Sequence, residues 1–271
     1  MSFELINNGN FNLPRIMMQF EPFTAYGDEF PFCTIKFMEG TNENLKNRKL
    51  IKKVGDHYFH QLDDNIVVAN ATSFVLINNN FSQMDVYLPP NGYFVEAQLS
   101  FLLLQGYRYI LAHHGQFQMH SAVVVHDGCG IAFCGLPGAG KSTQAHLWEE
   151  HLGAEALNLD QPCIFFENDE VYVSGSPWSG KEDCYKNKKV PLKAIFYVVQ
   201  APENSVERLS VAESFSHLYL NNYLVPFNEE MEKKHQNAVI RLASKVPVYR
   251  LKCTISREAV EVAHNIVFNN K

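Results

Sequence analysis

The chain carries one glycine-rich segment between a strand-like and a helix-like pattern: Gly135-Leu136-Pro137-Gly138-Ala139-Gly140-Lys141-Ser142. This segment, called the glycine loop below, matches G-x-x-x-x-G-K-[ST] at every required position. Glycines let a backbone fold around phosphates, and the amides at a helix N-terminus carry partial positive charge that attracts them. A chance match has a frequency of about one per cent in a chain of this length, before the strand-helix context is counted. We therefore expect a nucleoside triphosphate to bind here.

Roles within the loop follow from the chemistry of phosphate binding. The eight loop residues, together with Thr143, are expected to line the nucleotide site. Lys141 would reach the β and γ phosphates, and the Ser142 hydroxyl would bind a divalent metal. The ligands implied are ATP and Mg²⁺.

A carboxylate is needed near the metal and the phosphates, and Asp160 is the best candidate. It follows a predicted strand over residues 156–159, where it could hold the metal or accept a proton from an attacking hydroxyl. The alternative is a turn residue at the surface before Pro162. Weaker rivals lie around the predicted hairpin turn that comes next: Glu167, Asp169 and Glu170.

Two further residues are candidates for the site. His120 begins the strand that leads toward the glycine loop, although an isolated histidine is more often an ordinary strand residue than a catalytic one. Lys181 follows Gly180 in a loop, and it is joined in the sequence by Lys186, Lys188 and Lys189. These lysines form a basic patch that could contact phosphates, or else a solvated surface.

Sequence patterns divide the chain into a β-rich N-terminal region, 1–92, and a nucleotide-binding domain, 93–271. Short β-rich runs separated by turn residues predict antiparallel strands over 15–20, 33–37, 57–62, 66–69, 74–77 and 86–88. A break at 89–92 precedes a helix over 93–113, which is apolar nearly all round and is expected to bridge the two halves.

The second region is predicted to mix helices and strands, which indicates an α/β fold. A hairpin over 121–134 runs directly into the glycine loop, and a helix follows to about residue 151. Further strands are expected over 156–159, 163–173, 194–199 and 248–253. Helices are expected over 205–221, 229–244 and from 257, with Asn228 capping the second of these.

Bulk properties exclude several classes of protein. The chain has 271 residues, 46% of them hydrophobic, which is ample for a core, and a net charge of −6 that argues against a nucleic-acid-binding surface. The apolar run over 99–111 is interrupted and too short to span a bilayer, and no secretory signal is visible. We expect a cytoplasmic protein that binds neither nucleic acid nor membrane. A homo-oligomer is compatible with the sequence.

From His120 to Val199 the sequence resembles the HPr serine kinase type of P-loop protein, which shares its fold with phosphoenolpyruvate carboxykinases. It is most similar to small HPr-kinase-like proteins associated with peptide-modifying gene clusters. The resemblance implies an α/β P-loop kinase domain with a mixed sheet, preceded here by the β-rich region. It is carried by residues 120–123, 128–143, 147–148, 158–162, 175–181 and 190–195.

The resemblance also implies roles for individual residues. It makes Lys141 the phosphate-binding lysine, Ser142 a magnesium ligand and Asp160 the carboxylate that activates an acceptor hydroxyl. His120 takes the position of a histidine beside the phosphates. The family usually has a second acidic residue after this aspartate, whereas Gln161 stands here.

The activity implied is an ATP-dependent kinase that phosphorylates a hydroxyl of Ser or Thr type on a peptide or small protein. Two alternatives stay open. One is a nucleotide-binding regulatory or scaffold module without turnover. The other is a metabolic carboxykinase, but the arginine-bearing substrate segments and the manganese ligands of that class are not apparent in the sequence.

Overall fold

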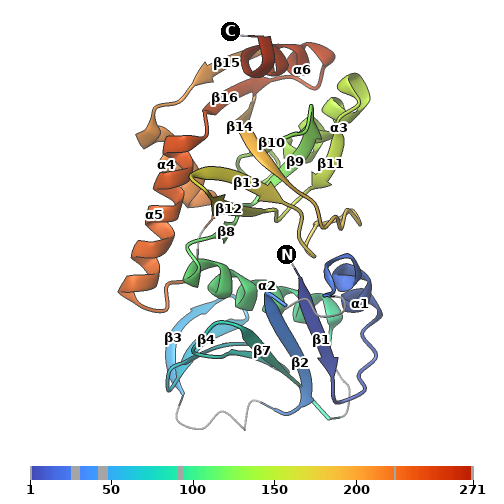
Figure 1. Ribbon diagram of the computed structural model, residues 1–271, viewed down its shortest axis with the longest axis vertical. Coiled ribbons are helices and arrows are strands. Elements are labelled where there is room, and N and C mark those ends of the chain that lie inside the picture. The colour runs from blue at the N-terminus through green and yellow to red at the C-terminus, as the bar shows by residue number, and fades with distance from the viewer. Residues whose placement is uncertain (1, 26–30, 42–47, 91–93, 223, 270–271) are drawn as a thin grey trace. The chain divides into compact units, whose positions relative to one another are not determined.

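The computed structural model describes residues 2–25, 31–41, 48–90, 94–222 and 224–269. Internal contacts divide the chain into two compact units. Unit 1 comprises Met1–Gly115 and Leu224–Lys234, and unit 2 comprises Gln116–Tyr223 and His235–Lys271. Each unit is a mixed α/β structure built on one mixed sheet (Figure 1). No described helix is both long and apolar enough to cross a membrane.

Unit 1 is built on a seven-stranded sheet in the order β1-β2-β7-β6-β5-β4-β3. The strands from β3 to β7 form an antiparallel meander, as the alternating pattern predicts. In contrast, β2 pairs in parallel with both β1 and β7. The bounds are Phe3–Asn7 (β1), Cys33–Glu39 (β2), Lys49–Val54 (β3), His57–Leu62 (β4), Asn65–Ala69 (β5), Phe74–Ile77 (β6) and Gln83–Leu88 (β7).

The strand predicted over 15–20 is wrong, because this segment forms helix α1, Pro14–Phe20, followed by the short helix η1, Glu21–Phe23. Pro14 occupies the first turn, where its missing N–H costs nothing. Ile16, Gln19 and Phe20 are buried, and the spacings of three and four residues place them on one helix face. A run of seven residues is too short for its apolar pattern to separate a strand from a helix.

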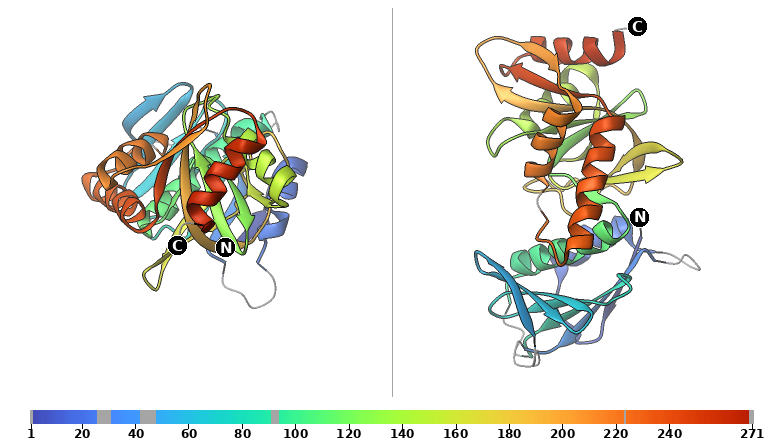
Figure 2. Two further views of the ribbon diagram at one scale, coloured as in Figure 1. Left: turned by 90° about the horizontal axis from the view of Figure 1, so that it is seen from above. Right: turned by 90° about the vertical axis from the view of Figure 1, so that its left-hand side faces the viewer.

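Helix α2, Glu96–His113, confirms most of the helix predicted over 93–113. Phe94 and Val95 precede the helix, with Val95 extended at its N-cap, and Tyr93 lies outside the described residues. It covers one face of the unit 1 sheet, against β5 and β6 (Figures 1 and 2). A Cβ on Gly106 would lie 2.7 Å from Met84 Sδ, so the helix approaches the sheet closely. Helix α2 belongs to unit 1, which runs to Gly115, whereas the predicted boundary stood at residue 92. The reason is that α2 buries its apolar residues in unit 1. Its role as a bridge stays a prediction.

Unit 2 is built on a nine-stranded sheet in the order β11-β9-β10-β14-β13-β12-β8, with β16 on β14 and β15 on β16. Among the described strand pairs of unit 2, β10–β14 and β14–β16 are parallel and the others are antiparallel. The bounds are Phe117–Gln118 (β8), Ser121–His126 (β9), Cys129–Cys134 (β10), Glu155–Asn158 (β11), Cys163–Glu167 (β12), Glu170–Ser174 (β13), Lys189–Gln200 (β14), Ser205–Arg208 (β15) and Val248–Cys253 (β16).

Helices cover both faces of this sheet. Alternate residues of β9 and β10 contribute to two separate cores, as expected for strands buried on both sides. One core is closed by α4, Val211–Asn221, and α5, Glu229–Lys245. The other is closed by α3, Lys141–Leu152, and α6, Arg257–His264, which continues into η3, Asn265–Asn269.

The helix predicted over 205–221 is only partly right. Its first residues form β15, which pairs with β16, and α4 begins after Ser210. Ser210 and Glu213 make a reciprocal capping box, which fixes the helix start at this point. The predicted cap at Asn228 is confirmed, since its Oδ1 accepts a hydrogen bond from Met231 N at 2.8 Å.

Candidate functional site

The glycine loop joins the end of β10 to the start of α3. Gly135 has a φ of +148°, and a Cβ there would lie 2.9 Å from the carbonyl oxygen of Val198. Gly140 caps α3 with a φ of +102°, a left-handed conformation that favours glycine. A Cβ on Gly138 or Gly140 would have no neighbour within 4 Å, so the space beside the loop is open. This open space beside Gly138 and Gly140 leaves room for an anion such as phosphate.

The N-terminal turn of α3 has no side-chain cap. Its first amides, at Lys141, Ser142 and Thr143, therefore have no partner within the helix and carry the positive end of its dipole. Lys141 Nζ donates to the carbonyl oxygens of Gly135 and Leu136 at 3.3 and 3.5 Å, which holds the ammonium over the loop. The loop therefore carries positive charge. None of the described ion pairs places a carboxylate in direct contact with the Lys141 ammonium.

Strand register brings the other predicted residues to the same edge of the sheet. Ser121, the first residue of β9, pairs with Cys134, the last residue of β10. His120 therefore lies beside the start of the loop. On the far side of β9, the carbonyl oxygen of Asp160 accepts a hydrogen bond from Ser121 N at 3.0 Å.

His120 and Asp160 form a close pair, with Nδ1 2.9 Å from Oδ1. Both side chains are about one-third exposed, at 34% and 30%, so the pair is open to a substrate. The backbone N–H of His120 is fixed by Asn222 Oδ1 at 2.9 Å. The carboxylate also acts on the loop, because its charge opposes the lowering of the Lys141 pKa that burial causes.

Gln161 adds an amide to this group. Its Nε2 lies 3.2 Å from His120 Nδ1. When Nδ1 carries the proton, it donates to the Asp160 carboxylate. When Nδ1 is unprotonated, it can accept a hydrogen bond from Nε2 of Gln161. The site therefore contains one carboxylate, one imidazole and one amide.

Asn158, to which sequence reasoning gave no function, lies behind Asp160. Its side chain is fully buried, and its Oδ1 accepts hydrogen bonds from the backbone N–H groups of Asp160 and Gln161 at 3.0 and 2.8 Å. Its Nδ2 donates to the carbonyl oxygens of Ser176 and Trp178 at 3.3 and 3.1 Å. An asparagine two residues before an aspartate is a weak local signal, since the partners at 176–178 are distant in sequence.

The loop that carries Lys181 passes directly against Asp160. Gly180 has a φ of +76°, and a Cβ there would lie 3.0 Å from the Cβ of Asp160. Lys181 itself is exposed and has no ion pair with any residue that the structure describes. It is therefore available to an anion.

The remaining lysines of the predicted basic patch are paired with acids. Lys186 and Lys188 contact the two carboxylate oxygens of Glu155 at 2.9 and 2.7 Å, and Lys189 contacts Glu167 at 2.6 Å. Hydrogen bonds from Lys188 and Lys186 lower the pKa of Glu155 to about 2. The patch is thus largely neutralised within the chain.

The other candidates for the site carboxylate, Glu167, Asp169 and Glu170, contact residues away from the glycine loop. Asp169 pairs with Lys245 at 2.6 Å, and Glu170 accepts a hydrogen bond from the Tyr172 hydroxyl at 2.9 Å. Glu167 is held by Lys189, as described above. None of these contacts involves the glycine loop.

Two pockets border the glycine loop. One has a volume of about 300 Å³ and is lined by residues 138–140, 143, 144, 200, 201 and 253–255. The other has a volume of about 260 Å³ and is lined by residues 136–139 and 197–200. Gln200 belongs to both, and its Nε2 donates to the carbonyl oxygen of Gly138 at 2.9 Å.

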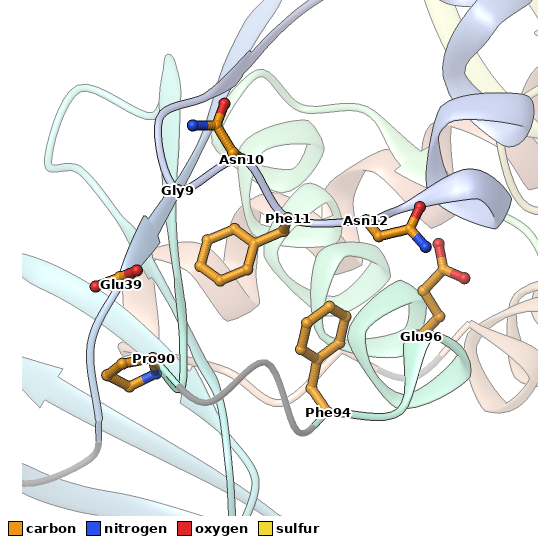
Figure 3. A pocket seen from close by; sticks show the side chains of 8 residues that line it. All are labelled: Gly9, Asn10, Phe11, Asn12, Glu39, Pro90, Phe94 and Glu96. Atoms are coloured by element: carbon orange, nitrogen blue, oxygen red, sulfur yellow. The ribbon is translucent and has the colours of Figure 1, made fainter.

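A further pocket, of about 580 Å³, lies in unit 1 and contains none of the predicted site residues (Figure 3). Phe11 and Phe94 form part of its wall, with ring centroids 6.1 Å apart. Its described lining includes the carboxylates Glu39 and Glu96 and no lysine or arginine. Such a charge distribution does not suit a triphosphate.

Metal ligands are sparse at the loop. No group of three or more His, Cys, Asp or Glu side chains that could hold a metal lies in the described part of the chain. A magnesium ion bound with a nucleotide commonly takes one or two protein ligands, with phosphate oxygens and waters completing its shell. Ser142 and Asp160 fit that arrangement in kind.

Comparison with solved structures shows a distant likeness. No protein-family model matches the chain, and no curated protein matches it. Among solved structures it is similar to the HPr(Ser) kinase/phosphatase from Coxiella burnetii, with 13% identity and a TM-score of 0.34. That match covers 56% of this chain and 88% of the other. A likeness this distant leaves the functional argument to the residues of the site.

Proposed function

We propose that the chain is an ATP-dependent phosphotransferase that acts, with Mg²⁺, on a Ser/Thr-type hydroxyl of a peptide or small protein. The observation that carries the proposal is the strand register at the end of β10. It places a loop suited to phosphates beside the His120–Asp160 pair. Phosphoryl transfer requires both an anion site and a group that can take the acceptor's proton.

Each residue has a defined task in this reaction. The loop amides and Lys141 hold the phosphates, and Ser142 and Asp160 would hold Mg²⁺, which neutralises charge on the transferred group. The acceptor oxygen forms a bond to the γ phosphorus as the bond to the ADP oxygen breaks. Asp160, oriented by His120, takes the hydroxyl proton.

The pocket of about 300 Å³ is proposed to hold the nucleobase. Thr143 and three loop residues line it, so it begins where the phosphates would lie. Ala201, Cys253 and Ile255 give it an apolar side, which suits the face of a flat ring.

Labelled ATP and a set of Ser- and Thr-containing peptides, including those encoded beside the gene, test the proposal. Mass spectrometry should detect a product heavier by one phosphoryl group, formed only when Mg²⁺ is present. Failure to transfer phosphate to any peptide, together with a lack of ATP binding, would refute both the activity and the nucleotide site.

Binding of ATP without transfer would instead support a regulatory or scaffold module. Gln161 favours this second candidate, because an amide occupies the place beside His120 where a second carboxylate would assist proton transfer. The two functions differ in one measurement: ADP accumulates with the phosphotransferase and does not with the module.

A further inference from the structure

Asn158 joins two loops that are separated in the sequence. Its Oδ1 holds the backbone of Asp160 and Gln161, and its Nδ2 holds the carbonyl oxygens of Ser176 and Trp178. Ser176 strengthens the junction, because its hydroxyl donates to the carbonyl oxygen of Gln161 at 2.7 Å and accepts from Trp178 N at 3.2 Å. The hydrogen bond from Asp160 N is partly buried, and the others are buried.

The amide of Asn158 can occupy this place in one orientation only. Rotation by 180° would put its oxygen against two carbonyl oxygens and its NH₂ against two N–H groups. No charged side chain takes part in the junction. The two loops are therefore held in one fixed arrangement, with Gly180 against the Cβ of Asp160.

We propose that Asn158 is a positioning residue that aims the Asp160 carboxylate at the acceptor hydroxyl, by fixing the segment 158–161 to the segment 176–181. This inference rests on the proposed phosphotransferase activity. Asn158 touches neither nucleotide nor acceptor in this account. Its substitution should change turnover more than nucleotide affinity, because a carboxylate displaced by about 1 Å loses much of its catalytic effect while the loop still binds phosphates.

The substitution Asn158→Leu tests the junction directly. Leucine keeps the size of the side chain, but it can neither accept from Asp160 N and Gln161 N nor donate to the carbonyl oxygens of Ser176 and Trp178. The Asp160 carboxylate then loses its fixed direction, whereas the glycine loop keeps its own contacts.

We expect the turnover of Asn158→Leu to be about ten- to a hundredfold lower than that of the parent, with the affinity for MgATP changed by less than about threefold. A loss confined to turnover distinguishes a positioning role from a merely structural one.

Asn70→Leu is the matched control. Asn70 is also buried and makes the same kind of turn in unit 1, where its Oδ1 accepts from Thr72 N and Ser73 N at 2.9 and 2.8 Å. The turnover of this variant should stay close to that of the parent, because the turn belongs to unit 1. Circular dichroism and thermal melting select the folded variants, and Ser176→Ala replaces any Asn158 variant that does not fold, with a smaller loss of turnover expected.

Imidazole ¹⁵N chemical shifts of His120 give a readout that does not need turnover. They should change in Asn158→Leu, as Asp160 moves away from Nδ1, and stay unchanged in Asn70→Leu. Turnover equal to that of the parent, with unchanged shifts, in a folded Asn158→Leu variant overturns the positioning role. Equal losses of turnover and of MgATP affinity overturn it as well, in favour of a purely structural residue. If the parent itself does not transfer phosphate, the proposed function fails. The His120 ¹⁵N shifts then test by themselves whether Asn158 positions Asp160.

Discussion

The Nδ1 atom of His120 lies 2.9 Å from Oδ1 of Asp160, across the end of β9 from the glycine loop. A histidine oriented by a carboxylate in this way can steady the carboxylate as it gains a proton, or share that proton. The contact joins residues forty positions apart in the sequence. The candidate site therefore contains a proton acceptor, the Asp160 carboxylate, that His120 holds in place.

Asp160→Asn should separate chemistry from binding. The amide keeps the size of the side chain and cannot take a proton, so turnover should fall by about two to four orders of magnitude while ATP still binds. Single-turnover assays across a range of Mg²⁺ concentrations measure both effects. A loss that is restored by excess Mg²⁺ would make Asp160 chiefly a metal ligand. Transfer as fast as in the parent at every Mg²⁺ level would exclude both roles.

Lys141→Ala should abolish measurable triphosphate affinity and leave the fold intact, because the ammonium faces the loop and fills no core. Calorimetric titration with ATP and Mg²⁺ measures the effect, and circular dichroism checks the fold. Lys186→Ala is the control, since Lys186 pairs with Glu155. Equal affinities in the parent and in Lys141→Ala would remove the loop from the account.

Triphosphate affinity should also depend on pH through Lys141. Burial lowers the pKa of this ammonium, so it loses its proton at a lower pH than an exposed lysine does. Only the charged form attracts phosphate. Affinity is therefore expected to be full at neutral pH and to fall on the alkaline side, and Lys186→Ala, which keeps Lys141, should show the same fall. A profile that stays flat up to pH 10 would contradict this assignment, since 10 is close to the ordinary lysine value of about 10.4.

Ala201→Phe should fill the pocket that is proposed for the nucleobase. ATP should bind about ten- to a hundredfold more weakly, because a phenyl ring and a base cannot share the same space. Tripolyphosphate, which has no base, should bind as it does to the parent. Ala212→Phe, at an exposed position of α4, serves as the control. If both ligands lose affinity equally, the pocket does not distinguish the base from the phosphates.

Lys181→Gln should weaken binding of nucleotide or of an acidic acceptor by a few-fold at low salt, with the effect fading as salt screens the charge. Lys188→Gln should have little effect, because its ammonium already contacts Glu155 at 2.7 Å. Binding measured at two salt concentrations tests the pair. Equal effects of the two substitutions would show that position relative to Asp160 does not matter.

Several parts of this arrangement could be foreseen in the sequence. The glycine loop has a local motif, and the hairpin before it has a turn at Asp127-Gly128, so β9, β10 and α3 followed directly from the pattern. The segments 15–20 and 205–208 were assigned wrongly, as a strand and as part of a helix, because short runs take their structure from distant partners. The hydrogen bonds of Asn158 and the ion pairs of Lys186 and Lys188 likewise join residues far apart in the chain. No local pattern encodes such contacts.

Strand β14 has a consequence for how the chain folds. It pairs in parallel with β10 before it in the sequence and with β16 after it. Parallel pairs need long crossover connections, which close slowly because much chain must be ordered first. During synthesis, one edge of β14 stays unpaired over residues 195–200 until residues 248–253 have emerged, and an unpaired edge is open to pairing with other chains. The segment beside the glycine loop is therefore among the last of unit 2 to be completed, and the nascent chain is most exposed to aggregation just before that point.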